Sequence, residues 1–226
     1  MKKILIAASL TVFLVACGAK SADNMAKYSL KLDIQDAAKK TELISASKRV
    51  AERVLESMGK TAQKENLDTG KADPVLTFTL PDAASKKTLD DVLTSGFKFR
   101  IMEEAPVATA DITVEQKAGS IGFRETGITE KDLEWVTAAP MPGSAKAEVR
   151  LDFTQAGRDI LAMVFKQNQG KTIGIFVRNK LVSSMAVNKV KPEDVIIISN
   201  VPSMVIANIF ADDVNVGLHT QYVPVK

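Results

Sequence analysis

Apolar positions change period several times along the chain, and each period predicts an element. Over residues 28–34 apolar and polar side chains alternate, which predicts a strand. Residues 43–58 carry apolar or small side chains every third or fourth position and are followed by Gly59, the pattern of an amphipathic helix. A strand over 75–80, a helix over 84–94 and a strand over 97–102 complete a β-α-β-α-β order.

A second set of elements begins at Ala147. Alternation over 147–153 predicts a strand, and Thr154 is a typical N-cap for a helix that ends at Gly170. The apolar segments 172–177 and 181–187 flank a short polar turn, which predicts a hairpin. The remaining pattern predicts a strand over 194–199, a short helix over 203–211 and a last strand over 217–223.

Glycine and proline interrupt the stretch between these two sets, so we expect residues 106–144 to form a linker region. Within it, Thr129 and Asp132 form a helix-capping pattern, and Trp135 is expected to fill a core. The expected fold class is α+β, with two small subdomains of the ferredoxin-like type, in which helices pack on mixed or antiparallel sheets. Their expected bounds are 28–105 and 145–226.

The first residues have the features of a lipoprotein signal peptide. Lys2 and Lys3 precede the apolar run 4–16, which is shorter than the roughly 20 residues that span a bilayer. The run ends in Leu-Val-Ala before Cys17, the only cysteine, and this resembles a bacterial lipobox. The resemblance implies cleavage before Cys17 and attachment of acyl chains, such as palmitate, to its thiol. The alternative is an ordinary secretory signal with an incidental cysteine.

This assignment sets the expected location of the protein. Residues 1–16 form the signal peptide, and residues 17–27 form the lipidated cysteine and a flexible, polar tether. Two or more acyl chains anchor a protein stably without a membrane-crossing segment. We therefore expect a protein that is lipid-anchored at the cell membrane and faces the periplasm or the extracellular side.

Composition excludes several classes of function. The chain has 226 residues, with 30 Lys+Arg against 27 Asp+Glu, and removal of Lys2 and Lys3 with the signal leaves 28 against 27. This near balance lacks the basic stripe that nucleic-acid binding needs. One Cys and one His exclude an internal disulfide and most multi-ligand metal sites. We expect no nucleic-acid partner, no small-molecule substrate, no cofactor and no metal.

The residues that could support catalysis do not form a catalytic set. His219 has no second histidine or nearby cysteine to work with, and a role at the surface or at a strand edge is expected for it. The paired carboxylates at 90–91, 103–104 and 212–213 are adjacent in sequence, so their side chains diverge on either a strand or a helix. The sequence therefore predicts a protein that is not an enzyme.

Several segments, in order, resemble one known family. They are GKTIGIFV at 170–177, LVSS at 181–184, ISN at 198–200, VIANIF at 205–210, RVAERVLESMG at 49–59 and TGITEKDL at 126–133. Together they resemble the first large periplasmic region of SecD, a protein-export subunit that works with SecF on the Sec translocon. The resemblance implies a base-like subdomain over 28–105 and a head-like subdomain over 145–226. The turn Arg178-Asn179 replaces the Asp-Gly of the family, and the membrane helices of SecD are missing.

The resemblance implies a binding module that assists protein export or holds unfolded polypeptide, with no proton coupling of its own. Its expected partners are Sec translocon components or unfolded exported chains. The hairpin edge could pair with an extended peptide. The candidate contact residues lie on that hairpin and in the following helix: Arg178, Asn179, Val182, Ser183, Ser184, Met185 and Met204. The alternative is a structural or envelope-assembly lipoprotein that serves as a protein dock.

Overall fold

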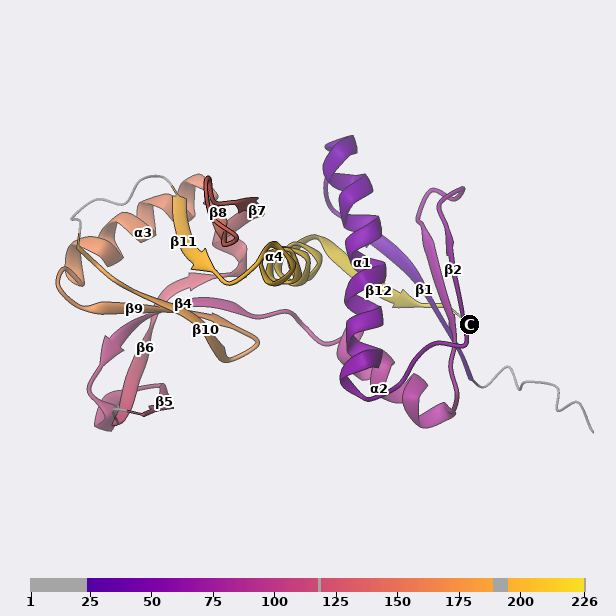
Figure 1. Ribbon diagram of the computed structural model, residues 1–226, viewed down its shortest axis with the longest axis horizontal. Helices are drawn as coiled ribbons and strands as arrows, with labels where there is room; N and C mark the ends of the chain where they lie inside the picture. Colours follow the sequence, from indigo (N-terminus) through magenta and orange to yellow (C-terminus); the bar gives the residue numbers. More distant parts are fainter. Residues whose placement is uncertain (1–23, 118, 189–194, 226) are drawn as a thin grey trace, which may run out of the picture.

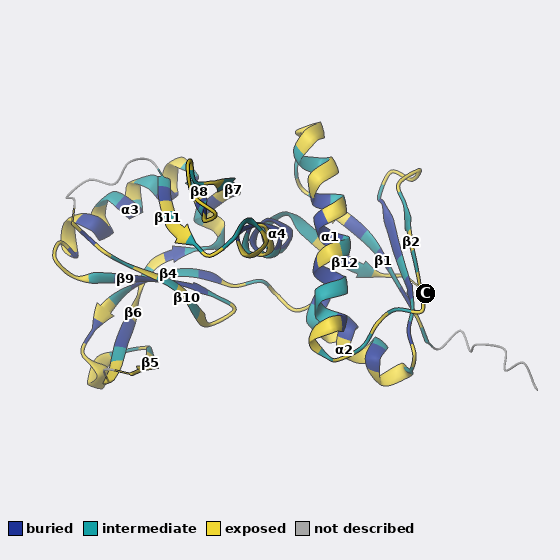
Figure 2. Cartoon of the chain, in the orientation of Figure 1, coloured by how far each residue is buried: buried dark blue, intermediate teal, exposed yellow. Residues whose placement is uncertain are grey.

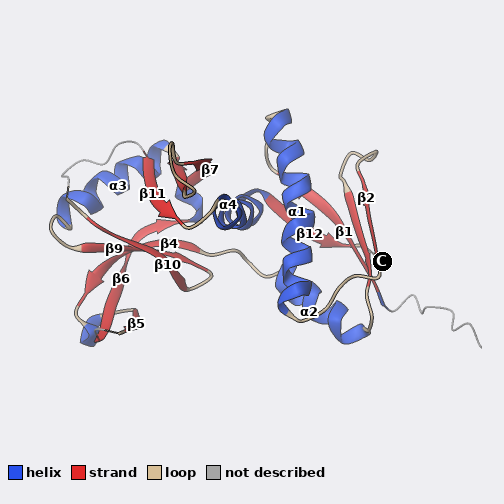
Figure 3. Cartoon of the chain, viewed as in Figure 1, coloured by secondary structure: helices blue, strands red, loops and turns tan. Residues whose placement is uncertain are grey.

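The computed structural model describes residues 24–117, 119–188 and 195–225. The described chain forms four α-helices and twelve strands, arranged in three antiparallel sheets (Figure 1; Figure 3). The predicted α+β class is confirmed. The signal peptide and the candidate lipidation residue Cys17 lie outside the described residues, so the anchor stays a prediction.

The first unit is a four-stranded sheet, with strand order β12-β1-β3-β2, that packs against two helices. Its elements are β1 (Met25–Leu32), α1 (Ala37–Ser57), β2 (Lys64–Asp68), β3 (Val75–Thr79), α2 (Ala83–Leu93) and β12 (Thr220–Pro224). Both helices begin at an aspartate: Asp36 accepts a hydrogen bond from the amide of Lys39, and Asp82 accepts one from the amide of Ser85. The first turn of α1 is exposed (Figure 2).

The second unit contains the other two sheets. The five-stranded sheet has the order β10-β9-β4-β6-β5, and the three-stranded sheet has the order β11-β8-β7. Its elements are β4 (Phe99–Ala105), η2 (Val107–Thr109), β5 (Ile112–Gln116), β6 (Gly119–Thr129), η3 (Glu130–Asp132), β7 (Leu133–Pro140), β8 (Ala147–Phe153), α3 (Gln155–Gln167), β9 (Thr172–Val177), β10 (Lys180–Ala186) and β11 (Val195–Val201).

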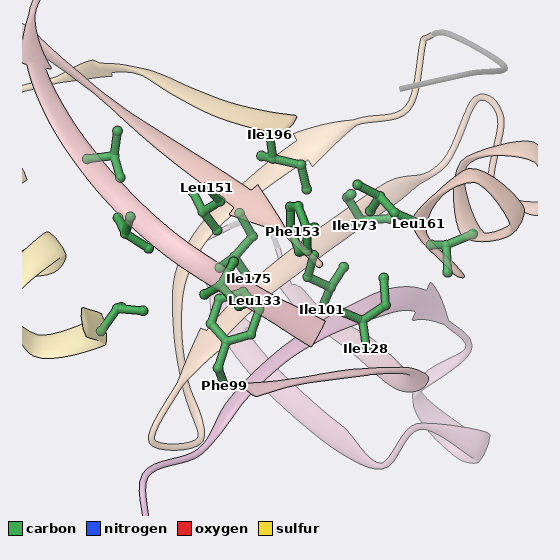
Figure 4. Packing of buried hydrophobic residues seen from close by; sticks show 14 of the residues in the cluster. Phe99, Ile101, Ile128, Leu133, Leu151, Phe153, Leu161, Ile173, Ile175 and Ile196 are labelled. Atoms are coloured by element: carbon green, nitrogen blue, oxygen red, sulfur yellow. The ribbon is translucent and has the colours of Figure 1, made fainter. Parts of the chain in front are cut away.

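These two sheets share one core with α3. Phe99, Ile101 and Ile175 from the five-stranded sheet meet Leu151 and Phe153 from the three-stranded sheet, and all five are buried (Figure 4). Burying side chains of this size contributes about 1.5–3 kcal/mol each. This shared core holds the edges of the two sheets in a fixed relation to one another.

The bounds of the two units differ from the expected 28–105 and 145–226. Strand β4, expected in the first unit, pairs with β6 and β9 of the second, and the C-terminal strand β12 pairs with β1 of the first. Residues 106–144, expected as a linker, contain β5, β6 and β7. Strand periodicity reports which residues alternate but carries no information on which strand is the neighbour.

Helix α4 (Met204–His219) connects the two units and is longer than the predicted helix over 203–211. The predicted helix ended before Asp212 and Asp213, and aspartate is a weak helix former. Both carboxylates instead pair with arginines of α1. Gly217 also lies inside the helix, and a glycine is needed there because the ring of Phe97 occupies the space that a Cβ would take.

Three sets of polar contacts fix α4 against its neighbours. Arg49 of α1 binds Asp212 through two hydrogen bonds, at 2.7 and 2.8 Å, and Arg53 bridges Asp212 and Asp213. The buried Asn215 amide accepts from the N–H of Val136 in β7 and donates to its carbonyl, both at 2.8 Å.

The third set surrounds His219, at the end of α4. Its ring stacks on Trp135, with ring centroids 5.5 Å apart. Its two nitrogens lie 2.9 Å from a carboxylate oxygen of Asp33 and 2.8 Å from the carbonyl oxygen of Glu134. Trp135 fills the core of the first unit, as expected, and His219 joins that unit to β7.

Candidate functional site

The predicted hairpin is present as β9 and β10. Arg178 and Asn179 form its turn, and both have a positive φ, 49° and 64°, as a type I′ turn requires. Arg100 donates a hydrogen bond to the Asn179 side chain at 2.8 Å and so holds the turn against the sheet. Strand β10 is an edge of the five-stranded sheet, so its outer backbone groups have no strand partner among the described residues.

A β-bulge redirects the side chains of this edge strand. Leu181 pairs with Phe176 and Ser183 pairs with Ile175, so Val182 has no partner on β9. Leu181 packs on the outer face of the sheet, beside Phe176, whereas Met185 packs on the shared core of the second unit. The bulge therefore moves the strand's side chains to the opposite face and turns Val182 toward the three-stranded sheet.

Val182 lines an apolar pocket of about 250 Å³ between the two sheet edges and α4. The pocket lies between β10, the C-terminal part of β11 and the first two turns of α4. Its walls are Val149, Val182, Ile198, Ser199, Asn200, Val201, Pro202, Ile206 and Phe210. Asn200 has a φ of 62°, at a second register irregularity between Ile198 and Val201, so the chain bends around the pocket mouth.

Exposed apolar side chains continue from the pocket along α4. Val205 is 68% exposed, Ile206 48% and Ile209 37%, whereas Ala207 and Ala211 on the opposite side of the helix are buried. We call Val182, Val205, Ile206 and Ile209, together with the pocket walls, the α4 patch. Soluble proteins rarely expose contiguous apolar surface without a binding role.

A groove of about 700 Å³ lies beside the α4 patch, between α1, β7 and α4, and includes Val205 and Ile209. Its charged rim comes from α1. Arg49 and Arg53 on this rim are bound to Asp212, whereas within the described chain no basic side chain pairs with Glu42 or Glu56. In the part of the chain that the structure describes, Glu42 and Glu56 are therefore unpaired acids at this groove, while the Nζ of Lys39 lies 4.7 Å from the ring of Trp135, which also lines it.

The predicted contact residues fall into different environments. Val182 belongs to the α4 patch, Ser184 is exposed on β10, and Ser183 is half-buried. Arg178 and Asn179 form the turn of the hairpin, and Arg178 lines a pocket together with Ile209 of the α4 patch. Met185 and Met204 are partly buried against the core of the second unit, so their side chains mainly pack.

Sequence reasoning missed Val205, Ile206 and Ile209. A sequence signal for them existed, because the helix is apolar on two sides: Ala207, Ala211 and Val214 form one stripe and these three residues form the other. A helix that carries apolar side chains on both sides has more apolar surface than one core can cover. The pocket itself had no sequence signal, since its walls come from β8, β10, β11 and α4.

In the described chain, the possible metal ligands are the acidic residues and the single histidine. They contain no group of three or more His, Cys, Asp or Glu side chains placed to hold a metal ion. The adjacent acids Glu103 and Glu104 diverge as predicted: Glu103 accepts a hydrogen bond from Asn168, and Glu104 accepts one from the amide of Thr172. Burial opposes ionisation of Glu103, but the hydrogen bonds from Arg124 and Asn168 outweigh it and lower its pKa.

Comparisons with known proteins found solved structures of similar fold. No protein-family model matches the chain, and no curated protein matches it. A crystal structure of SecDF from Thermus, described as a translocon-associated membrane protein, matches with a TM-score of 0.50 at 15% identity over 89% of this chain. This chain corresponds to 30% of that SecDF chain.

Two further SecDF structures match less closely. One, from a study of SecDF as a membrane component that enhances protein export, has a TM-score of 0.45 at 14% identity and covers 88% of this chain and 99% of that chain. The other, SecDF in a super-membrane-facing form, has a TM-score of 0.46 at 14% identity and covers 89% of this chain and 30% of that chain. The similarity to the Thermus structure shows a SecD-like fold, which confirms that part of the resemblance.

In the described part of the chain, none of the helices has the length and apolar content needed to cross a membrane.

Proposed function

We propose that this protein is a lipid-anchored, extracytoplasmic binding module that holds extended apolar segments of unfolded polypeptide at the α4 patch and thereby assists protein export. The observation that carries the proposal is the apolar pocket between the β10 and β11 edges, with Val205, Ile206 and Ile209 exposed beside it. The proposed role is binding alone, without catalysis and without proton coupling of its own.

The geometry suits an extended chain. An edge strand offers backbone donors and acceptors to a peptide that adds to the sheet, and a pocket beside it selects the side chain that the peptide presents. The pocket, at about 250 Å³, is smaller than the roughly 300–1,000 Å³ typical of small-molecule sites. It therefore suits one apolar side chain of a polypeptide better than a complete small ligand.

The SecD-like fold connects this site to export. SecDF itself is described as translocon-associated and as enhancing protein export. A module of this fold, anchored at the outer surface of the cell membrane through Cys17, would meet polypeptides as they emerge. This gives Sec translocon components and exported chains as the proposed partners.

Charge near the α4 patch adds a preference. Glu42 and Glu56 border the groove beside Val205 and Ile209. An apolar segment flanked by lysine or arginine should therefore bind more tightly than the same segment flanked by glutamate, and added salt should reduce the difference.

Peptide binding by the purified mature protein tests the proposal. Fluorescence anisotropy would follow labelled, extended apolar peptides with lysine or glutamate flanks. Ile206→Asp and Val182→Asp should each weaken binding at least tenfold. Each replaces an aliphatic side chain that the bound peptide would cover, and burying such a side chain contributes about 1.5–3 kcal/mol. Met163→Asp, at a residue 55% exposed on α3, is the matched control and should bind as the wild type does.

The result that contradicts the proposal is equally direct. The α4 patch is not the binding site if the wild-type protein binds neither peptide. The same conclusion follows if Met163→Asp loses as much affinity as Ile206→Asp. Circular dichroism on every variant separates loss of binding from loss of folding.

Photo-crosslinking in cells identifies the partner class. A photoreactive residue at position 182 or 206 should give adducts with exported chains or translocon subunits, and these adducts should disappear in the Cys17→Ser background. Adducts confined to a single envelope protein would instead make this chain a docking lipoprotein with a SecD-like fold.

A further inference from the structure

The sheet of the first unit has one open face. Helices α1 and α2 cover the side that carries Tyr28, Leu76 and Phe78, and no helix of the described chain covers the other side (Figure 1). The strand registers align the side chains of that open face in rows across the sheet. From β1, β3 and β2 the face presents Met25, Thr79 and Lys64 in one row and Lys27, Thr77 and Asn66 in the next.

The unmatched charge on this face is positive. Its acids are neutralised, because Asp73 pairs with Lys31 and Asp68 lies 3.6 Å from Lys71. Within the described residues no carboxylate pairs with Lys27 or Lys64. The other side chains in these two rows are small and polar, apart from the exposed Met25, and the next row places Val75 and Val223 beside Ser29. The face is therefore basic and partly apolar.

The chain enters the fold at the same place. Strand β1 begins at Met25, in the row that contains Thr79 and Lys64. Residues 17–24 connect Cys17 to this point, and even fully extended they reach at most about 28 Å. An acyl group on Cys17 would thus hold this end of the molecule close to the bilayer surface.

We propose that the open face of the sheet, with Lys27 on the inner strand β1 and Lys64 on the edge strand β2, lies against the anionic headgroups of the bilayer that holds the anchor. This proposal rests on the lipidation of Cys17 and goes beyond the proposed binding function. Attraction between lysines and anionic headgroups acts within about 8 Å at physiological salt. A tether that reaches at most about 28 Å keeps the face close enough to the bilayer to come within this range, and the attraction then holds it there. Because α1 lies between the sheet and α4, the α4 patch is then turned away from the membrane (Figure 1).

Quenching of tryptophan fluorescence by lipids tests this orientation. The mature chain is coupled through Cys17, its only thiol, to a maleimide lipid in vesicles of phosphatidylcholine with or without phosphatidylglycerol, both containing nitroxide-labelled lipid. A tryptophan is placed on the open face, Thr77→Trp, or on the β10 edge, Ser184→Trp. Trp135 is buried and common to both proteins, so the wild type supplies its background signal.

We expect at least twofold stronger quenching at position 77 than at position 184 on phosphatidylglycerol vesicles, and the difference should disappear in high salt or without phosphatidylglycerol. Lys27→Glu with Lys64→Glu should bring quenching at position 77 down to the level at position 184. Lys131→Glu with Lys166→Glu, an equal change in charge on the second unit, should leave it unaltered.

Equal quenching at both positions, or an equal effect of the two double substitutions, would overturn the orientation. A third contrary result is a soluble dimer of the Cys17→Ser protein that dissociates when Lys27 and Lys64 are both replaced by glutamate. The last result would make the open face an interface between copies of this chain. Peptide binding in solution separates this test from the proposed function. If no variant binds peptide while the quenching contrast persists, the binding function fails and the orientation stands.

Discussion

Single ion pairs decide how α4 attaches to the first unit. Asp212 is the most buried acid of the group, with its side chain 8% exposed, and it accepts hydrogen bonds from both Arg49 and Arg53. The Nε of Arg53 is buried and has no hydrogen-bond partner among the described residues. Arg53 therefore depends on Asp212 and Asp213 to compensate for its partial burial.

Asp212→Asn should destabilise the protein by about 2–3 kcal/mol, because it leaves two guanidinium groups without a full counter-charge in a half-buried site. Urea denaturation of the mature protein measures the change. Asp91→Asn removes the exposed pair with Lys87 and should have no measurable effect. An equal loss in both variants would show that general charge balance, and not this contact, matters.

A second residue-scale effect depends on pH. Hydrogen bonds from the Ser85 hydroxyl and amide, and then the contact with Lys60, lower the pKa of Asp82 from 3.8 to about 2. Since the folded state favours the ionised form, this contribution is complete above pH 4 and is lost as the pH falls toward 2. The stability difference between wild type and Asp82→Asn, measured by unfolding from pH 2 to 7, should therefore be largest above pH 4 and become much smaller at the acid end. A difference that stays constant with pH would contradict this.

At the scale of the element, α4 and the hairpin β9–β10 are held by unusual local features. Asn215 satisfies both backbone groups of Val136 in β7 from inside the helix, and it is buried. Arg178 has a left-handed backbone conformation, with a φ of 49°, that costs an ordinary L-residue about 1–2 kcal/mol.

Asn215→Ala should cost about 2–4 kcal/mol, because it leaves a buried N–H and a buried carbonyl without partners. Chemical denaturation gives the value, and Asn208→Ala, at an exposed position of the same helix, is the control. If the two variants lose the same stability, the loss reflects helix propensity and not the contact with β7.

Arg178→Asn should stabilise the protein by about 0.5–1 kcal/mol, because asparagine tolerates the left-handed conformation far better than arginine does. The midpoint of thermal unfolding should rise. Arg158→Asn in α3, where the backbone is helical, should not raise it. No rise for Arg178→Asn would mean that the turn relaxes at no cost in the wild type.

For the whole molecule, the chain passes between the two units more than once. It leaves the first unit after α2, builds the second from β4 to β11, and returns through α4 to finish in β12 beside β1. The two units therefore cannot be separated at one linker.

Lipidation is the prediction that concerns the molecule as a whole. Labelled palmitate should be incorporated into the wild-type protein and not into Cys17→Ser, because the acyl groups are expected on that thiol and on the amine that cleavage exposes. The variant should also move from the membrane fraction to the soluble fraction. Palmitate in the Cys17→Ser protein, or an unchanged distribution, would contradict the lipobox assignment.

The sequence pattern predicted most elements of this fold because each one is a local property. Period-two alternation located β1 and β8, apolar residues at helical spacing located α1 and α2, the cap Thr154 located α3, and the hairpin β9–β10 followed from two apolar runs around a polar turn. Of the candidate site, the sequence located Val182 but not the residues of α4 that lie beside it.

What remained was decided by contacts between distant residues. Strand partners, the continuation of α4 through Asp212 and Gly217, and the pocket all depend on residues far apart in the sequence. Asp212 stays in a helix because Arg49 and Arg53 reach it across 163 and 159 positions, respectively. The sequence by itself therefore determined most of the elements and their class, and it predicted the anchor at Cys17. Only the tertiary structure decided which strands pair and where the apolar surface collects, because burial and pairing energies belong to pairs of segments and not to one segment alone.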